Sequence, residues 1–403
     1  MEFNMKILIV GQVFYPDHFR INDLVKELAK EHDVKMVTGL PDYDLGKVPK
    51  EFKFFKRRRE DFCGAKVVRV PIISRRKGAI FRSLNYLSFA FTGSLYTFFL
   101  REQYDVVFSY QTSPITMFVP GIVYAKKNKV RSVLYTLDLW PESVKAMPIG
   151  EGSFLFSLLL KMSRKIYHAA DKIIVSSPSF KDYLVDVIGL EYNKIDFLPQ
   201  YTDEIDGELE RKSRPKDKMV QFTFAGNIGL VQDLETVINA AKLINHRDFI
   251  VNIVGSGSHE ENVKKMVAKL EIDRHFIFHG RKIHGEMDRI YDETDVCVLT
   301  LRNDDFIGKT IPGKLQTYMA KGKAILGAIS NDSMKIIQES KSGLCVESGD
   351  VAGLARIMEY YMDHPEVIPI YGQNAQLYYD EHFSKEVFIK SLMDYLEGEY
   401  NYV

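Results

Sequence analysis

Short apolar runs alternate with helical patterns along most of the chain, and this alternation constrains the fold more than any other feature. The run Lys6–Val10 (KILIV), for example, is followed by a helical pattern over Ile21–Glu31. The runs are continuously apolar, so both faces of the sheet must be covered, as in a parallel sheet between helices. Strands of the first half are predicted at Lys6–Val10, Val34–Thr38, Val106–Tyr110, Ser132–Leu137 and Lys172–Ser176.

A second series of the same kind begins after a charged segment. Thr202–Lys218 has almost no apolar residues and includes a proline, as expected of a linker or surface loop. The strands predicted after it are Gln221–Ala225, Phe249–Val254, Phe276–His279, Val296–Leu301 and Ala324–Ala328. We therefore predict an α/β protein with two doubly wound, Rossmann-like parallel-sheet domains, residues 1–200 and 201–380. A ligand cleft is expected between the carboxyl ends of their strands.

The charge balance and the cysteines narrow the function classes. The chain has 54 basic and 54 acidic residues, which is no signature of nucleic-acid binding. Its cysteines, Cys63, Cys297 and Cys345, are far apart and make no metal-ligand spacing. Met1–Met5 is too short and too polar for a secretory leader, so we expect a cytoplasmic protein with reduced, buried thiols.

One apolar and aromatic segment, Leu84–Leu100 (LNYLSFAFTGSLYTFFL), raises the question of a membrane. It is shorter than the ~20 residues that a spanning helix needs. We favour a helix packed on a sheet, and the alternative is a helix on the membrane surface. Basic clusters flank the segment and would suit anionic lipid, a pyrophosphate-linked acceptor or simply a solvated face. They are Lys56–Arg59, and Arg75, Arg76, Lys77 and Arg82.

The strongest local motif is KTIPGKLQTYMAKG at Lys309–Gly322. Pro312 stands near the first turn of a predicted helix, where its missing N–H does no harm. The free N–H groups and the helix dipole there make an anion site, to which Lys314 would add a full charge. A diphosphate fits such a site without metal. An ordinary turn with a surface lysine explains the local spacing equally well.

Three other strand ends in the same half carry glycines, at Gly226–Gly229, Gly255–Gly257 and Gly280. Turns use glycine anyway, but one large ligand that touches adjacent strand ends explains the clustering better than chance. Arg281 follows the last of them and suits either a base or phosphate contact or a plain surface position. The sequence contains no GxGxxG, Walker, GxSxG, HExxH or CxxC motif.

Asp138 follows a strand of the first half, in a loop with Trp140 and Pro141. Its carboxylate could bond sugar hydroxyls or an attacking hydroxyl, or it could form an Asx-type turn or a helix cap. We favour the functional interpretation because Trp140 and Pro141 would hold the loop rigidly. His279 and His284 stand near each other without other ligands, so structural histidines are expected there.

At these motifs the sequence resembles the retaining glycosyltransferases of family 4, which have the two-domain GT-B fold. The resemblance covers nearly the whole chain, through KILIVGQVFYPD, FAGNIGLVQDLETVINAA, FHGR and TIPGKLQTYMAKGKAILG. LYTLDLWPESV is most similar to bacterial transferases of O-antigen or capsule synthesis, several of which use UDP-linked N-acetylated sugars. The resemblance implies transfer from a UDP-sugar to a hydroxyl of a glycan or polyprenyl-pyrophosphate-linked acceptor, without metal or another cofactor, in the cytoplasm or at the inner face of its membrane.

The resemblance also implies which residues form the site. Asp138 and Lys314 would stand at the reaction centre. The acceptor would meet Tyr15, His18 and Arg20. The final helix near Lys385–Tyr400, within 381–403, would pack back on the first domain. The donor would contact Gly226, Asn227, Gly229, Gly255, Arg281, Lys309, Thr310, Ile311, Pro312 and Gln316.

Some positions depart from the family pattern. Many members carry two glutamates, eight positions apart, where this chain has Gly308 and Gln316. Many also have an arginine and a lysine where Asn227 and Gln232 stand, and a histidine in place of Asp138.

Positive charge for the diphosphate must then come from elsewhere, and Lys314, Lys309 and Arg302 are the candidates. Two alternatives stay open: a nucleotide-sugar epimerase of the same fold, and an inactive nucleotide-sugar-binding partner subunit.

Overall fold

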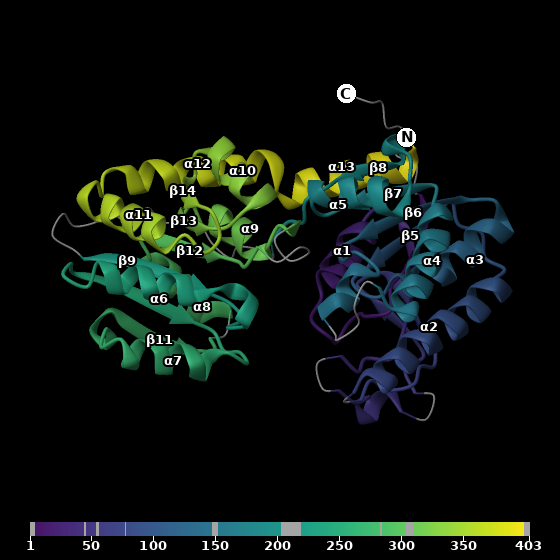
Figure 1. Cartoon of the computed structure of the whole chain (residues 1–403). Coiled ribbons are helices and arrows are strands. Elements are labelled where there is room, and N and C mark those ends of the chain that lie inside the picture. Colours follow the sequence, from purple (N-terminus) through teal and green to yellow (C-terminus); the bar gives the residue numbers. More distant parts are fainter. Residues whose placement is uncertain are drawn as a thin grey trace. The chain divides into compact units, whose positions relative to one another are not determined.

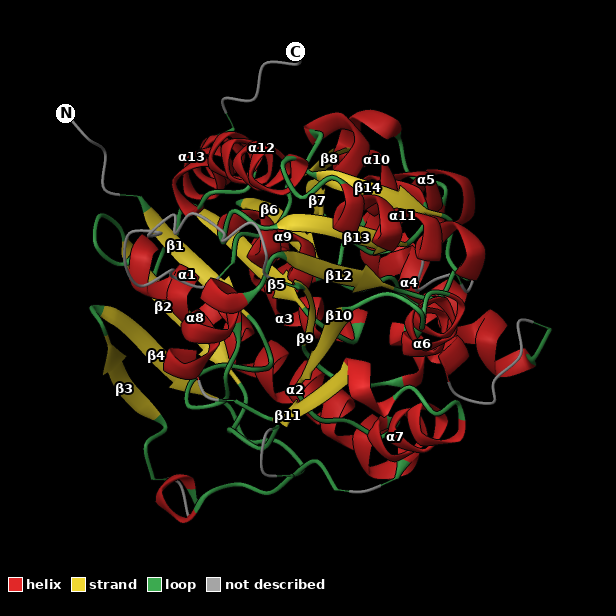
Figure 2. Ribbon diagram, turned by 90° about the vertical axis from the view of Figure 1, so that its left-hand side faces the viewer, coloured by secondary structure: helices red, strands yellow, loops and turns green. Residues whose placement is uncertain are grey.

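A computed structural model describes residues 5–43, 46–53, 56–76, 78–146, 152–202, 219–282, 284–303 and 309–398 (Figure 1). The chain divides into two compact units, one of Met1–Leu198 with Ile389–Val403 and one of Pro199–Phe388. Apart from Thr202, the predicted linker lies outside the described residues. Helices flank the sheet of each unit (Figure 2). The predicted architecture of two α/β parallel-sheet domains is therefore confirmed.

The first unit is built on an eight-stranded sheet of order β3-β4-β2-β1-β5-β6-β7-β8. All neighbours pair in parallel except the β3–β4 hairpin. β1 and β5 lie at its centre and are buried on both faces, which explains their continuous apolar runs. The strands are β1 (Lys6–Val10), β2 (Asp33–Thr38), β3 (Arg59–Phe62), β4 (Ala65–Arg69), β5 (Val106–Gln111), β6 (Arg131–Thr136), β7 (Lys172–Val175) and β8 (Ile195–Phe197).

The hairpin between β3 and β4 corrects one expectation. Its two turn residues, Cys63 and Gly64, both have positive φ, of 51° and 94°. A tight hairpin turn of this kind projects from the sheet, so Cys63 is exposed, although a buried thiol was predicted. Cys297 is buried and Cys345 is half-buried. The sequence did not predict this hairpin, because β3 is an edge strand whose charged residues do not form an apolar run.

The α-helices α1 to α5 of the first unit each lie between two strands of its sheet that are consecutive in the chain. None of the described helices of the chain has the length and hydropathy that crossing a membrane requires. The α-helices are α1 (Arg20–Leu28), α2 (Ala79–Phe99), α3 (Val119–Asn128), α4 (Phe154–His168) and α5 (Pro178–Tyr183), and the last helix, α13 (Lys385–Glu397), begins in the second unit and ends in the first. Short helical turns are η1 (Lys50–Phe52), η2 (Ile115–Phe118), η3 (Glu142–Ala146), η4 (Leu184–Ile188) and η5 (Tyr192–Lys194).

The second unit has a six-stranded, wholly parallel sheet of order β11-β10-β9-β12-β13-β14. The strands are β9 (Val220–Ala225), β10 (Phe249–Val254), β11 (Phe276–Gly280), β12 (Val296–Thr300), β13 (Ala324–Ala328) and β14 (Gly343–Val346). The helices and turns are η6 (Leu230–Gln232), α6 (Leu234–Leu243), α7 (Glu260–Lys269), η7 (Asp273–His275), α8 (His284–Glu293), α9 (Gly313–Ala320), α10 (Asn331–Ser340), α11 (Val351–Asp363) and α12 (Val367–His382).

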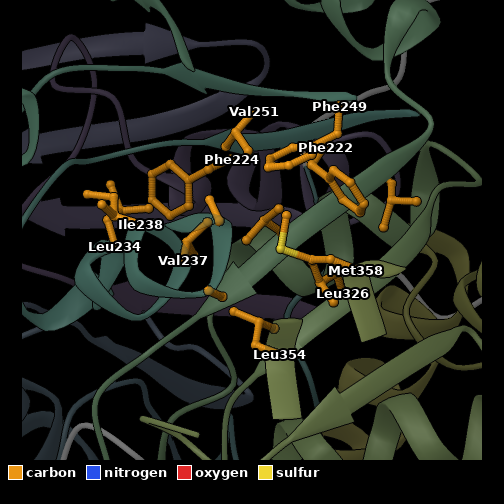
Figure 3. Close-up of a cluster of buried hydrophobic side chains, with 14 of the residues drawn as sticks. Phe222, Phe224, Leu234, Val237, Ile238, Phe249, Val251, Leu326, Leu354 and Met358 are labelled. Atoms are coloured by element: carbon orange, nitrogen blue, oxygen red, sulfur yellow. The ribbon is translucent and has the colours of Figure 1, made fainter. Parts of the chain in front are cut away.

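One core cluster of the second unit joins the sheet to the helices α6 and α11 (Figure 3), and a second joins the sheet to α9, α10 and α12. Phe222 and Phe224 of the central strand β9 belong to one buried cluster with Val237 of α6 and Met358 of α11. Burial of each such side chain stabilises the fold by roughly 1.5–3 kcal/mol. Strand order reverses between β9 and β12, and α/β sheets bind ligands at the carboxyl ends of strands beside such a reversal.

Candidate nucleotide-sugar site

A pocket of about 450 Å³ opens in the second unit where β9, β10 and β11 end. The first turn of α9 borders it, so the strand ends and the helix start predicted from the sequence meet there. It is lined by Ala225, Gly226, Asn227, Val254, Gly255, Ser256, Arg281, Lys282, Met287, Tyr291, Lys314 and Thr317.

Two glycines make this pocket possible. Gly226 has φ +142°, and a Cβ there would lie 2.6 Å from Cε of Lys314. Gly255 has φ +133°, and a Cβ there would lie 1.8 Å from the carbonyl oxygen of Gly226. Backbone conformation disfavours a side chain at both positions, and at Gly255 the backbone of Gly226 also leaves no space for one. The glycines at these strand ends let two backbones and a lysine side chain approach one another.

Lys314 lies in the first turn of α9, just after Pro312 at the N-cap. Its Nζ donates to Oε1 of Gln232 and lies 3.9 Å from the centroid of the Phe224 ring. Burial lowers the pKa of Lys314 to about 7. Among the described residues no carboxylate pairs with this amine. A partly buried cation whose partners are an amide oxygen and an aromatic ring is a ready contact for an anionic ligand.

The other candidate cations are placed differently. Arg302 is already engaged, with Nε 3.8 Å from Asp233 and Nη2 3.4 Å from Glu235. Lys309 is not among the residues that line the pocket. Arg281 does line it and is exposed at its rim. Of the three cations named from the sequence to replace the family pair, Lys314 is therefore the one at the pocket.

The other residues predicted to contact the sugar donor differ in whether they line the pocket. Asn227 lines it and is exposed, whereas Gly229 is buried and does not line it. Thr310 and Ile311 also lie outside the lining, and the Thr310 carbonyl accepts from Ser333 Oγ at 3.4 Å. Pro312 likewise caps the helix without lining the pocket.

Gln316 is buried, and no described residue bonds its Oε1. Its side chain is therefore enclosed by protein rather than presented to the pocket. Thr317, which was not predicted, lines the pocket one turn after Lys314. The helical spacing of three residues was the signal that could have found it.

Asp138 lies just after β6 and is held within its own loop. Its Oδ1 accepts from Ser143 Oγ at 2.5 Å, and its carbonyl accepts from Gln111 Nε2 at 2.9 Å. Trp140 joins the same loop to the segment after the neighbouring strand β5, because its Nε1 donates to Ser113 Oγ at 2.9 Å. Burial raises the pKa of Asp138 to about 6. The carboxyl thus combines a local capping contact with a proton affinity near neutrality.

The predicted acceptor residues follow β1. Tyr15 is 44% exposed, and its ring packs on Phe62 with centroids 5.2 Å apart. The loop is anchored by backbone contacts, since the Tyr15 N–H donates to Asn22 Oδ1 at 2.8 Å. His18 is exposed and Arg20 opens α1. All three side chains belong to one short segment at a single strand end.

A buried polar network beside this loop was not anticipated from the sequence. Gln12 Nε2 donates to Asn85 Oδ1 at 2.7 Å, and Asn85 Nδ2 donates to Asp42 Oδ2 at 3.0 Å and to the Ile73 carbonyl at 2.7 Å. Burial raises the pKa of Asp42. The network fixes the loops after β1 and β2 to α2. A lone asparagine in an apolar helix was its only signal.

The histidine pair carries no metal cluster in the described part of the chain. His279 Nε2 is 2.8 Å from Asn252 Oδ1, and burial lowers the pKa of His279. His279 is therefore a structural histidine. The side chain of His284 lies outside the described residues.

Comparison with known families agrees with this architecture. Residues 18–200 match the family described as Glycosyl transferase 4-like domain, and residues 206–377 match Glycosyl transferases group 1. The chain belongs to the GT-B glycosyltransferases. Residues 206–377 include every residue that lines the pocket.

Two relatives of this glycosyltransferase are bacterial proteins. The putative colanic acid biosynthesis glycosyl transferase WcaI of Escherichia coli K12 is 22% identical over 416 residues, which cover 98% of this chain and 100% of WcaI. The probable glycosyltransferase WbjE of Pseudomonas aeruginosa is 27% identical over 299 residues, covering 70% and 73%. The structure of Anabaena HepE in complex with UDP has a TM-score of 0.69 at 13% identity, covering 98% of this chain and 100% of HepE, and shows the fold.

The family resemblance leads us to expect a lysine, in many members, at the position of Gln232 in η6. In this chain the side chain of Gln232 accepts a hydrogen bond from Lys314 of α9. Gly308, the first of the two missing glutamate positions, lies outside the described residues.

Proposed function

We propose that this transferase moves an N-acetylated sugar from a UDP-sugar to a hydroxyl of a polyprenyl-pyrophosphate-linked acceptor in bacterial surface polysaccharide synthesis. The observation that carries the proposal is the Lys314 amine, which lines the glycine pocket with no carboxylate partner among the described residues. A diphosphate would supply that counter-charge. The relative named for colanic acid synthesis and the HepE complex with UDP favour the same substrate class.

Catalysis would depend on charge that develops on the leaving group. As the glycosidic bond breaks, negative charge grows on the β-phosphate. The start of α9 and Lys314 are held in place beforehand, so they stabilise the transition state more than the ground state. Arg281 at the rim would meet the base or the α-phosphate. These groups provide the positive charge that a metal ion supplies in other transferases, so we propose metal-independent transfer.

Retention at the anomeric carbon would follow from attack on the face that the leaving group departs from. The departing phosphate oxygen would take the proton of the attacking hydroxyl. Asp138 would orient the sugar or the acceptor. Tyr15, His18 and Arg20 would contact the acceptor from one loop.

Donor binding and transfer by a Lys314→Ala variant test the proposal. A UDP-sugar at a hundredfold its dissociation constant adds ~2.7 kcal/mol of stability, which a thermal-shift screen detects. Loss of Lys314 should lower kcat by roughly 10²–10³, as for other preorganised donors. Lys335→Ala, an exposed lysine of α10, is the matched control. Turnover of Lys314→Ala near that of the control would contradict the assignment.

Two further incubations separate this reaction from its alternatives. Donor alone should be recovered unchanged, and epimerised donor would instead identify an epimerase. EDTA should leave transfer intact, and full loss of activity that added metal restores would overturn the metal-independent mechanism.

A further inference from the structure

The helix α2 has its apolar face on the outside. Its buried stripe is Asn85, Phe89, Gly93 and Thr97, of which only Phe89 is a large apolar residue. The opposite stripe repeats with helical spacing and is exposed, for example 71% at Phe91 and 75% at Ile80. The exposed apolar residues of α2 are Ile80, Phe81, Leu84, Leu87, Phe91, Leu95, Phe98 and Phe99.

Specific contacts of the buried stripe fix the rotation of α2 about its own axis. Asn85 is held by hydrogen bonds to Gln12 and Asp42, as described above. Thr97 Oγ1 donates to the Pro120 carbonyl of α3 at 2.8 Å. A Cβ on Gly93 would lie 2.8 Å from Cγ of the same proline. The close approach of α3 and the polar bonds thus set the rotation of α2 and leave its apolar stripe outward.

The beginning of α4 extends this apolar surface. Phe154 is 87% exposed, and Leu155 and Leu158 are also exposed. Both α2 and α4 contact the turn η2. We call the exposed apolar residues of α2 together with Phe154, Leu155 and Leu158 the α2–α4 face. So many exposed large apolar side chains on two helices that pack against one turn mark an interaction site.

Charge on the surrounding helices is of one sign. α2, α3 and α4 contain no aspartate or glutamate, although the whole chain has as many acidic as basic residues. Arg76 lies over the ring of Phe81 at 5.2 Å, and Lys127 lies near the ring of Phe98 at 5.4 Å. Cations therefore border the exposed aromatic rings. The basic residues within the three helices are Arg82, Lys126, Lys127, Lys161, Arg164 and Lys165.

We propose that the α2–α4 face docks on an anionic lipid bilayer. Phenylalanine and leucine side chains would enter the boundary between headgroups and acyl chains, and the bordering lysines and arginines would meet lipid phosphates. A helix without carboxylates, apolar outside and flanked by cations, matches that boundary more closely than it matches a protein surface of mixed charge. The proposal concerns the first unit alone and does not depend on the transfer reaction.

Co-sedimentation of the full chain with vesicles, without donor, tests the proposal. We expect binding to vesicles of phosphatidylglycerol and phosphatidylcholine in equal parts, weaker binding to phosphatidylcholine alone, and loss of binding as salt rises. Phe91→Glu/Leu95→Glu should weaken partition to the anionic vesicles at least about tenfold, since each change removes apolar area and adds a repelled charge. Ile370→Glu/Leu377→Glu is the matched control, because both side chains are exposed apolar residues of α12.

A second variant reports whether α2 enters the bilayer. Phe91→Trp adds an indole to a chain with a single tryptophan, and its emission should shift to the blue more with anionic vesicles than with phosphatidylcholine alone. Equal vesicle binding by both double variants would overturn the proposal. So would a vesicle-independent dimer that Phe91→Glu/Leu95→Glu dissociates, because the face would then join two copies of the chain. Circular dichroism and melting temperature, measured in parallel, verify that the variants fold, and unchanged UDP binding keeps this result separate from the donor site in the second unit.

Discussion

The amine of Lys314 donates a hydrogen bond to the side-chain oxygen of Gln232, which lies 82 positions earlier in the chain. The contact joins the first turn of α9 to η6 across the carboxyl end of β9. It brings an amine to Gln232, where the family resemblance leads us to expect a lysine in many members. The activity could depend on a positive charge at this place or on a lysine in α9 in particular. Moving the lysine from α9 to η6 distinguishes the two.

A relocated lysine should restore part of the lost activity. The single change Lys314→Ala is expected to reduce kcat by roughly 10²–10³. In Gln232→Lys/Lys314→Ala the new amine can reach the vacated space, so we expect at least about a tenfold recovery over the single variant. Steady-state kinetics measure both. Gln232→Met/Lys314→Ala, which restores volume without charge, should show no recovery, and equal recovery by this control would mean that packing is responsible.

Nucleotide affinity should fall as pH rises above neutrality. The pKa of Lys314 in the free protein is lowered to about 7, so above that pH the free amine is neutral. A bound diphosphate favours the charged form and raises this pKa, so binding takes up a proton. The dissociation constant of UDP should therefore increase above about pH 7, by at most about tenfold per pH unit.

Calorimetry in buffers of different ionisation enthalpy measures the proton taken up with UDP at pH 8. Lys314→Met should remove this uptake, because it removes the titrating amine. Uptake that persists in Lys314→Met would place the titrating group elsewhere.

A methyl group at Gly226 should disturb the pocket more than its size suggests. The Cβ would lie 2.6 Å from Cε of Lys314, and the residue would keep a φ of +142°. Backbone strain of this kind costs roughly 1–3 kcal/mol of stability. We expect Gly226→Ala to weaken UDP binding and to lower the melting temperature. Gly285→Ala, which adds a methyl group to open space in α8, should leave both unchanged or slightly raise stability.

The acid limb of the transfer rate should depend on Asp138. Burial raises its pKa to about 6, and the hydrogen bond from Ser143 lowers it. If the carboxylate form orients the reactants, kcat should fall as pH drops through about 6. Ser143→Ala removes a bond to the charged form, so the limb should move to higher pH. Asp138→Asn should lower transfer more than UDP binding, and an unchanged acid limb in that variant would assign the titration to another group.

The sequence by itself determined the two parallel-sheet units and the strand ends that carry the glycines. Continuous apolar runs leave few alternatives to a covered parallel sheet, and such patterns are local. Local pattern also places Lys314 at a helix start. Its partner, the inward side chain of Gln316 and the polar network around Asn85 depend on residues far apart in sequence, which only packing brings together.

The helix α2 shows the same limit most clearly. Most of its large apolar residues repeat with helical spacing on one face, and such a pattern ordinarily indicates the buried face, whereas here that face is exposed. Hydrogen bonds of Asn85 and Thr97, with the close contact at Gly93, determine the rotation. Asn85 and Thr97 find hydrogen-bond partners, and Gly93 admits Pro120, only when this stripe faces inward. The tertiary structure therefore buries Asn85, Phe89, Gly93 and Thr97 and leaves the other phenylalanines of α2 exposed.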